Sequence, residues 1–238
     1  MIEELKKMID ESKTIVFFGG AGVSTASGIK DFRSIDGLYN MKYPYPPEEI
    51  LSHTFFINRP NEFYKFYKDK MNTLDKLPNE CHKYLVELEH IGKLKAIITQ
   101  NIDGLHQKAG SKNVLELHGT IYKNKCMKCG KDYEVESVFK AKDVPKCSCG
   151  GIIKPEVVLY EEPLNEEVIY QSIKAIKEAD MLIVAGTSLK VYPANTYINY
   201  FNGKYLVVIN NEKTIADNYA SLVINEDINE VFKKLHSM

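Results

Sequence analysis

Short apolar runs and helical repeats alternate along this chain. The runs are rich in β-branched residues and hardly alternate between apolar and polar positions, as expected for parallel strands buried on both faces. They occupy residues 14–18, 96–98, 181–184 and 206–209. Apolar residues recur at helical spacing over 81–88 and 169–176, and a last helix is expected over 228–235. Strands and helices alternating in this way predict an α/β fold with a doubly wound, Rossmann-like parallel sheet.

Two stretches interrupt the alternation. Residues 32–75 are rich in aromatic residues and proline ahead of a helical run around Phe63 and Phe66, and residues 121–154 hold two cysteine pairs and many lysines. We predict that both are insertions that build a smaller domain from a helical module and a metal-binding module. The larger domain then consists of residues 1–31, 76–120 and 155–238.

Charge and hydropathy exclude some classes of function. The 238 residues include 31 basic and 32 acidic side chains, which gives a formal net charge of −1. A nucleic-acid partner is disfavoured, because DNA-binding domains carry a basic surplus. No apolar run approaches the ~20 residues needed to span a bilayer, and the first ten residues lack the apolar block of a secretory signal. We therefore expect a cytoplasmic protein that does not contact the membrane.

The cysteines predict a metal site. Four of the five lie in two close pairs, Cys126-x-x-Cys129 and Cys147-x-Cys149. In a reducing compartment such pairs indicate metal ligands before disulfides. Four thiolates close the coordination shell of a tetrahedral zinc ion, so the predicted Zn²⁺ is structural. Cys81 lies on the apolar stripe of a helix and is expected in the core.

Small polar residues follow the ends of several predicted strands. The first strand leads into Gly20-Ala21-Gly22, where glycines allow close approach to a phosphate at a helix N-terminus, although a tight turn without a nucleotide fits equally well. Gln100 to Asp103, His118, Gly186 to Ser188 and Asn210-Asn211 follow other runs. Because the carboxyl ends of parallel strands face one crevice, these residues are expected to converge there. By spacing alone, His118 remains either a general base or a structural histidine.

Seven segments occur together in the order found in one family. They are GGAGVSTASGIKDFR, TQNIDGLH, LHGT, the cysteine quartet, KPEVVLYEE, GTSLKVYPA and VVINNEKT. In these segments, over nearly its whole length, the chain resembles the sirtuins, and small bacterial members most of all. The resemblance implies an NAD-dependent protein-lysine deacetylase that converts acetyl-lysine and NAD to lysine, nicotinamide and O-acetyl-ADP-ribose.

The resemblance also implies roles for particular residues. His118 would be the general base, with Asn101 and Asp103 beside it in the catalytic set. NAD would contact Gly20, Ala21, Gly22, Thr25, Asp31, Phe32, Arg33, Gln100, Asn101, Ile102, Asp103, His118, Gly186, Thr187, Ser188, Asn210, Asn211 and Ile228. The acetylated peptide would lie as an added strand between residues 156–161 and 190–192. Its contacts would include Val158, Leu159, Tyr160, Glu161 and Val191.

Several residues depart from the family pattern. Lys30 stands where proline is usual, and Tyr160-Glu161 replaces a frequent Phe-Gly, which adds a negative charge and suggests a preference for basic peptides. Desuccinylating members carry Tyr-x-x-Arg where this chain has Tyr64-Lys65-Phe66-Tyr67. The missing arginine favours an uncharged acyl group such as acetyl, although Lys65 or Lys68 leaves other acyl groups as an alternative.

Two other readings stay open. A mono-ADP-ribosyltransferase would use the same NAD residues. A zinc-ribbon binding module, less favoured, would use the lysines near the cysteines, which are Lys123, Lys125, Lys128 and Lys131. We expect acetylated peptides or proteins as partners and take a monomer as the working assumption.

Overall fold

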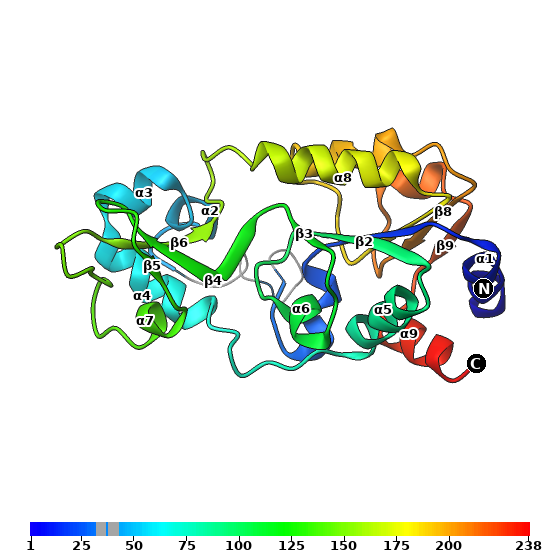
Figure 1. Cartoon of the computed structure of the whole chain (residues 1–238), viewed down its shortest axis with the longest axis horizontal. Helices are drawn as coiled ribbons and strands as arrows, with labels where there is room; N and C mark the ends of the chain where they lie inside the picture. The colour runs from blue at the N-terminus through cyan, green and yellow to red at the C-terminus, as the bar shows by residue number, and fades with distance from the viewer. Residues whose placement is uncertain (32–36, 38–42) are drawn as a thin grey trace.

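A six-stranded sheet and a three-stranded sheet lie towards opposite ends of the long axis (Figure 1). The computed structural model describes residues 1–31, 37 and 43–238. The larger sheet is parallel, in the order β3-β2-β1-β7-β8-β9. Its strands are β1 (Ile15–Gly19), β2 (Leu94–Thr99), β3 (Val114–Glu116), β7 (Met181–Ala185), β8 (Tyr205–Ile209) and β9 (Leu222–Ile224). The smaller sheet is antiparallel, in the order β5-β4-β6, and consists of β4 (Gly119–Cys126), β5 (Asp132–Tyr133) and β6 (Ile153–Val157).

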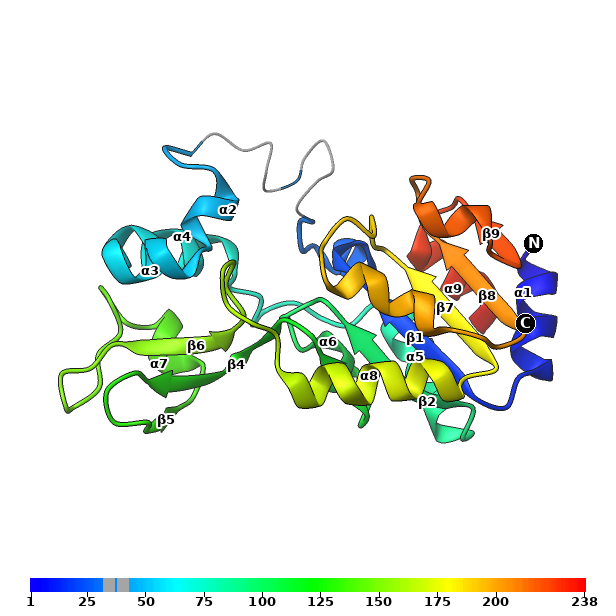
Figure 2. The same ribbon diagram turned by 90° about the horizontal axis from the view of Figure 1, so that it is seen from above.

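Helices cover both faces of the parallel sheet. The α-helices are α1 (Ile2–Glu11), α2 (Pro47–Ile50), α3 (His53–Asn58), α4 (Pro60–Lys70), α5 (Glu80–His90), α6 (Leu105–Ala109), α7 (Glu136–Phe139), α8 (Glu166–Glu178) and α9 (Ile228–His236). Figures 1 and 2 show α8 on one face of the sheet and α5 and α9 on the other. The prediction of a doubly wound parallel sheet is confirmed.

Successive residues of the central strands point into different cores. Ile15 and Phe17 pack in a cluster with α1, α5 and α9, whereas Val16 and Phe18 pack in a cluster with α8. Side chains alternate between the two faces of a strand, so a strand covered on both sides must be apolar at every position. Every residue of β1 and β7 is buried, which explains why the sequence shows continuous apolar runs there.

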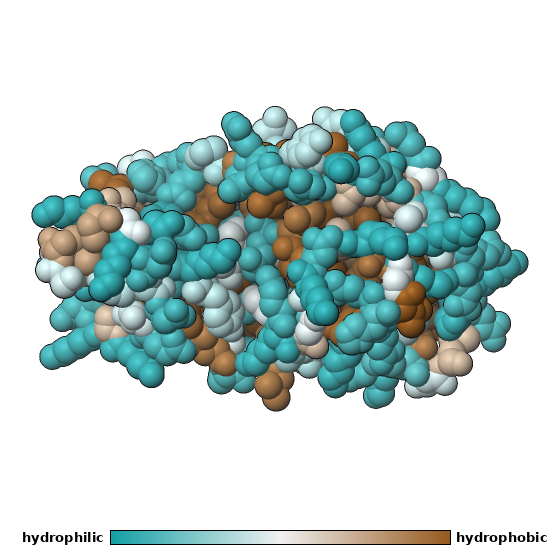
Figure 3. All heavy atoms as spheres, viewed as in Figure 1, coloured by the Kyte–Doolittle hydropathy of each residue, from teal (hydrophilic) through white to brown (hydrophobic). Residues whose placement is uncertain are grey.

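The cover provided by α8 is incomplete. Val168, Ile169 and Ile173 face the sheet but are only partly buried. Figure 3 shows a largely hydrophilic surface in which apolar side chains gather in a hollow along this helix. The core on the α8 side is therefore less shielded from water than the core under α5 and α9.

An aromatic cluster forms the core of the smaller lobe. Phe56, Phe63, Tyr64 and Tyr67 from α3 and α4 are fully buried together. Tyr64 donates its hydroxyl hydrogen bond to the carbonyl of Ile153 on β6. Burial of large aromatic side chains supplies most of the stabilisation of a core this small.

Side-chain caps fix where the long helices begin. Asn79, Asn165 and Asp227 accept hydrogen bonds from backbone N–H groups in the first turns of α5, α8 and α9. Asn79 also donates from Nδ2 to the carbonyl of Val23, at 2.8 Å. The start of α5 is thereby tied to the glycine-rich segment after β1.

The local structure differs from the expectation in two places. The helix expected after the first strand is replaced by two single-turn 3₁₀ helices, Ala21–Val23 and Thr25–Ser27. The helix α1, absent from the sequence reading, packs Leu5 and Ile9 into the core. None of the helices that the structure describes has the length and apolar character to span a bilayer.

Gly119 is required where the chain passes from β3 of the parallel sheet into β4 of the smaller sheet. Its φ is +73°, and a Cβ atom there would lie 1.9 Å from the carbonyl oxygen of Glu156. Gly92 has a similar φ of +76° but no atom within 4 Å of the same position. The two glycines therefore separate the cost of backbone strain from the cost of a steric clash.

We predict that Gly119→Ala lowers the free energy of unfolding by ~2–4 kcal/mol, because strain and overpacking add. Gly92→Ala should lose only ~1 kcal/mol. Urea denaturation of both variants, followed by circular dichroism, measures the difference. Equal losses would show that the contact with Glu156 relaxes without cost.

Candidate functional site

A cavity of about 760 Å³ lies between the carboxyl ends of the central strands and the smaller lobe. Residues after β1, β2, β7 and β8 line it. From β1 the sheet extends through β2 on one side and β7 on the other. The carboxyl ends of strands at such a reversal are the usual binding crevice of a doubly wound sheet, and the volume suits a small-molecule site.

Most residues predicted for the site line this one cavity. They are Ala21, Gly22, Thr25, Asp31, Gln100, Asn101, Ile102, Asp103, His118, Val158, Leu159, Tyr160, Glu161, Gly186, Thr187, Ser188, Val191, Asn210, Asn211 and Ile228. Gly20 is not among the lining residues. Phe32 and Arg33 lie outside the described residues.

The glycines after β1 serve a contact within the chain. The N–H groups of Gly20 and Gly22 donate to the carbonyls of Ala185 and Gly186, at 3.1 and 2.9 Å. A Cβ atom on Gly20 would lie 2.7 Å from the carbonyl oxygen of Gly186, and one on Gly22 would lie 2.8 Å from its Cα. These two amides are therefore not free to bind a phosphate, and the glycines allow two backbone turns to touch.

A buried polar network joins the glycine-rich segment to the segment after β2. Ser24 donates to Oδ2 of Asp103 at 2.7 Å, and Nδ2 of Asn101 donates to the Ser24 hydroxyl at 3.1 Å. Burial raises the pKa of Asp103, while hydrogen bonds from the Leu105 N–H and from Ser24 act in the opposite direction. Asp103 thus offers a fixed, buried acceptor at the cavity wall.

His118 is oriented by a backbone carbonyl. Its Nδ1 lies 3.0 Å from the carbonyl oxygen of Gln100. A carbonyl oxygen only accepts hydrogen bonds, so Nδ1 carries the proton and Nε2 of the neutral ring keeps its lone pair. Burial lowers the pKa of His118, although the bond to Gln100 acts in the opposite direction. A neutral, oriented imidazole of this kind can accept a proton near neutral pH.

Two further segments line the cavity together with His118. In one, the N–H of Val158 donates to the carbonyl of His118 at 2.9 Å, and Leu159 is buried. In the other, Val191 and Tyr192 follow Leu189, whose carbonyl accepts from the side chain of Asn195 at 3.2 Å.

Sequence reasoning missed several residues of the cavity. Ser24 is the centre of the polar network, and its signal was its place directly after the glycines. Lys70, Met71 and Thr73 also line the cavity. They lie at the end of α4 and directly after it, where the smaller lobe contributes to the cavity, so no local pattern marks them.

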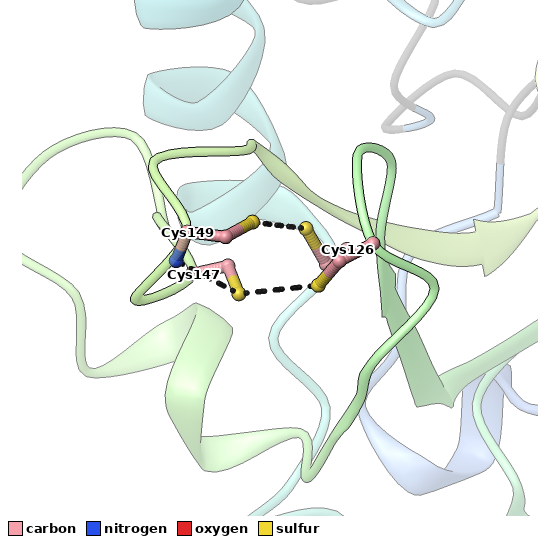
Figure 4. Close-up of side chains that lie close together, drawn as sticks. Cys126, Cys147 and Cys149 are labelled. Atoms are coloured by element: carbon pink, nitrogen blue, oxygen red, sulfur yellow. Dashed lines mark hydrogen bonds between the residues drawn. The ribbon is translucent and has the colours of Figure 1, made fainter.

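The four paired cysteines converge in the smaller lobe (Figure 4). All four sulfur atoms lie within 4.8 Å of one another, with Cys126–Cys149 at 3.5 Å and Cys129–Cys147 at 3.6 Å. Four thiolates bound at ~2.3 Å around a tetrahedral zinc ion lie about 3.8 Å apart. Gly130 and Gly150, with φ of +73° and +81°, make the turns after each pair. The quartet therefore fits one structural zinc ion.

Known proteins with similar sequences indicate one family. The model of the Sir2 family matches residues 20–193. An NAD-dependent protein deacetylase of Clostridium acetobutylicum is 58% identical over 236 residues, covering 98% of this chain and 96% of that protein. A protein of the same name from Clostridium perfringens is 56% identical over 238 residues, covering 98% of each.

Solved structures agree with these relatives. A Sir2 variant with a deacetylated p53 peptide and 3′-O-acetyl ADP ribose superposes with a TM-score of 0.92 at 38% identity, covering 99% of this chain and 97% of that one. A complex of Sir2 with a p53 peptide and NAD⁺ gives 0.89 at 37% identity, covering 100% and 98%. On its sequence, its fold and the arrangement of its cavity, the chain belongs to the Sir2 family.

Proposed function

We propose that this protein is an NAD-dependent protein-lysine deacetylase, which converts acetyl-lysine, NAD and water to lysine, nicotinamide and O-acetyl-ADP-ribose. The observation that carries the proposal is the orientation of His118, whose Nδ1 is held by Gln100 in a cavity shared with Asn101 and Asp103. The names of the relatives and the peptide and NAD complexes of the solved neighbours support it.

NAD fits the chemistry of the cavity wall. A buried carboxylate at Asp103 can accept hydrogen bonds from a carboxamide, and the hydroxyls of Thr187 and Ser188 can donate to phosphate or ribose. When bound, NAD would supply the ribose carbon from which nicotinamide leaves and to which the acetyl oxygen bonds, and the ribose hydroxyl that takes the acetyl group. We assign NAD binding to the residues predicted for it. Gly20 has an indirect part, because it lies behind the cavity wall and supports it.

His118 acts as the general base in this proposal. Its unprotonated Nε2 accepts a proton from a ribose hydroxyl, and the carbonyl of Gln100 stabilises the resulting imidazolium through Nδ1–H. Asn101 and Asp103 are placed by Ser24 to orient the nicotinamide end.

The acyl-lysine lies between Val158, Leu159 and Val191, with the peptide backbone continuing past Tyr160 and Glu161. The cations considered for an acidic acyl group are not available to it. Lys68 donates to the carbonyls of Ala141 and Asp143, and Lys65 is not among the residues lining the cavity. Lys70 does line the cavity, but it pairs with Asp69 at 2.8 Å. An uncharged acyl group such as acetyl is therefore favoured.

We also propose the division into an NAD-binding domain of residues 1–31, 76–120 and 155–238 and a small domain of residues 32–75 and 121–154. The separate sheets and separate apolar cores support it.

We place the enzyme in the cytoplasm, because its five free cysteines suit a reducing compartment.

Mass spectrometry of an acetyl-lysine peptide, with and without NAD, tests the reaction. We expect NAD-dependent loss of the acetyl group together with O-acetyl-ADP-ribose, and a fall in kcat of ~10²–10⁴ in His118→Ala. The exposed His90→Ala is the matched control and should retain turnover. Turnover by His118→Ala at the wild-type rate would remove this residue from the mechanism. ADP-ribose found on protein instead would favour the transferase alternative.

The protonation state of His118 can be measured directly. Its lowered pKa means that the ring stays neutral as the pH falls through 6.5, so a histidine-detected NMR titration should place its midpoint below that value. His236 should titrate above 6.5, because the hydrogen bonds that its ring donates to the carboxylates of Glu87 and Glu80 raise its pKa. His118→Gln assigns the signal, and a midpoint of His118 above that of His236 would contradict the structure.

We predict that zinc stabilises the smaller sheet and not the parallel sheet. Wild-type protein should bind about one zinc ion per chain, and Cys147→Ser should lose most of it, because a four-thiolate site needs every ligand. Elemental analysis measures the content, and hydrogen exchange should show lost protection in β4–β6 with β1 and β7 retained. Cys81→Ala, outside the quartet, is the control and should keep its zinc. Zinc retained by Cys147→Ser would refute the assignment.

A further inference from the structure

Glu161 has an unusual backbone conformation at the edge of the cavity. Among the described residues, Glu161 (φ +75°) and Leu189 (φ +52°) are the non-glycine residues with positive φ. Leu189 is buried, and its N–H and carbonyl are held by Thr187 and Asn195. Glu161 is exposed and lines the cavity. A side chain in this region costs free energy that glycine would not, and such residues gather at functional sites.

The carboxylate of Glu161 is held at a fixed place on the cavity wall. Its Oε2 accepts a hydrogen bond from the N–H of Thr54 at 2.8 Å, at the start of α3. Hydrogen bonds from the side chain and the N–H of Thr54 hold the pKa of Glu161 below its ordinary value. The group therefore stays ionised at neutral pH, held at one edge by Thr54.

The neighbouring carboxylate is neutralised, whereas that of Glu161 is not. Glu162 forms an ion pair with Lys154 at 3.0 Å and a second contact with His53 at 2.9 Å. Within the described part of the chain, no lysine or arginine forms an ion pair with Glu161. The wall beside the proposed peptide path thus carries one oriented negative charge that no lysine or arginine of the described residues neutralises.

The cavity is lined by a second group that attracts cations. Tyr192 is 80% exposed and lines the same cavity. The face of a tyrosine ring attracts a guanidinium group. Leu159 is buried deeper in the wall, at 2% exposure, so Glu161 lies nearer the entrance than the acyl pocket does.

We propose that Glu161 is a specificity-determining residue whose carboxylate binds a basic side chain of the substrate peptide adjacent to the acetyl-lysine. The proposal rests on the proposed function, because it needs the peptide to occupy the wall formed by residues 158–161. The positive φ at Glu161 is then maintained by its use in substrate selection and by the bond to Thr54.

An exposed ion pair of this kind has a modest effect that salt screens. One arginine in the right position should lower KM by ~2–5-fold relative to alanine, with kcat nearly unchanged. One glutamate at the same position should raise KM by a similar factor. Both effects should shrink as the ionic strength rises from ~20 to ~300 mM.

The test is a scan of acetyl-lysine peptides that are otherwise alanine-rich and uncharged. A single arginine, or a single glutamate, is moved through the positions flanking the acetyl-lysine, and KM and kcat are measured for each peptide. Glu161→Gln removes the charge and retains a side-chain acceptor for Thr54. Glu161→Gly removes the charge, the bond to Thr54 and the backbone strain together. Glu3→Gln removes an equal charge from the exposed face of α1 and is the matched control.

We expect the arginine preference in the wild-type protein and in Glu3→Gln, and its loss in both variants at position 161. An arginine preference that persists in Glu161→Gln, or one that is absent from the wild-type protein, would overturn the proposal. If Glu161→Gly alone slows every peptide equally, the residue only positions the wall, which also refutes charge selection. Failure to deacetylate any peptide would instead refute the proposed function.

Discussion

The contact between two backbone turns, after β1 and after β7, is the constraint on which the crevice depends. The Gly22 N–H donates to the Gly186 carbonyl, and a Cβ atom on Gly186 would lie 2.5 Å from the nitrogen of Val23. The two turns approach so closely that neither Gly22 nor Gly186 could be replaced by a residue with a side chain. Because the two strands are neighbours in the sheet, the contact fixes the floor of the cavity and places Ser24 under the segment after β2.

Gln100 extends this constraint to the reacting end of the cavity. Its N–H donates to the carbonyl of Gly19 at 3.0 Å, its side chain donates to Thr187 at 3.2 Å, and its carbonyl orients His118. One residue therefore links the ends of β1, β2 and β7 to His118. The orientation of the imidazole is set by a backbone carbonyl, so the ring is preorganised for the role that we propose for it.

The strands of the smaller lobe lead into the cavity wall along which we propose that the peptide lies. β4 starts at Gly119, directly after His118, and pairs with β6, which leads into Val158 and Leu159. At the other end of the same two strands, the cysteine quartet joins the turn after Cys126 to the turn around Cys147 (Figure 4). The cysteine quartet thus lies away from the cavity, yet it joins the two strands whose opposite ends adjoin His118 and Val158.

The sequence by itself determined the buried strands, the zinc ligands and most of the residues at the strand ends. These signals are local, because burial on both faces requires apolar runs and a shared metal requires paired cysteines. The tertiary structure alone decided that Gly20 supports the wall from behind, that Ser24 centres the polar network and that Lys70 and Thr73 reach the cavity. It also replaced the expected helix after β1 by 3₁₀ turns, since Gly22 bonds to Gly186. Such partners are set by packing between segments far apart in the chain, which periodicity and spacing do not encode.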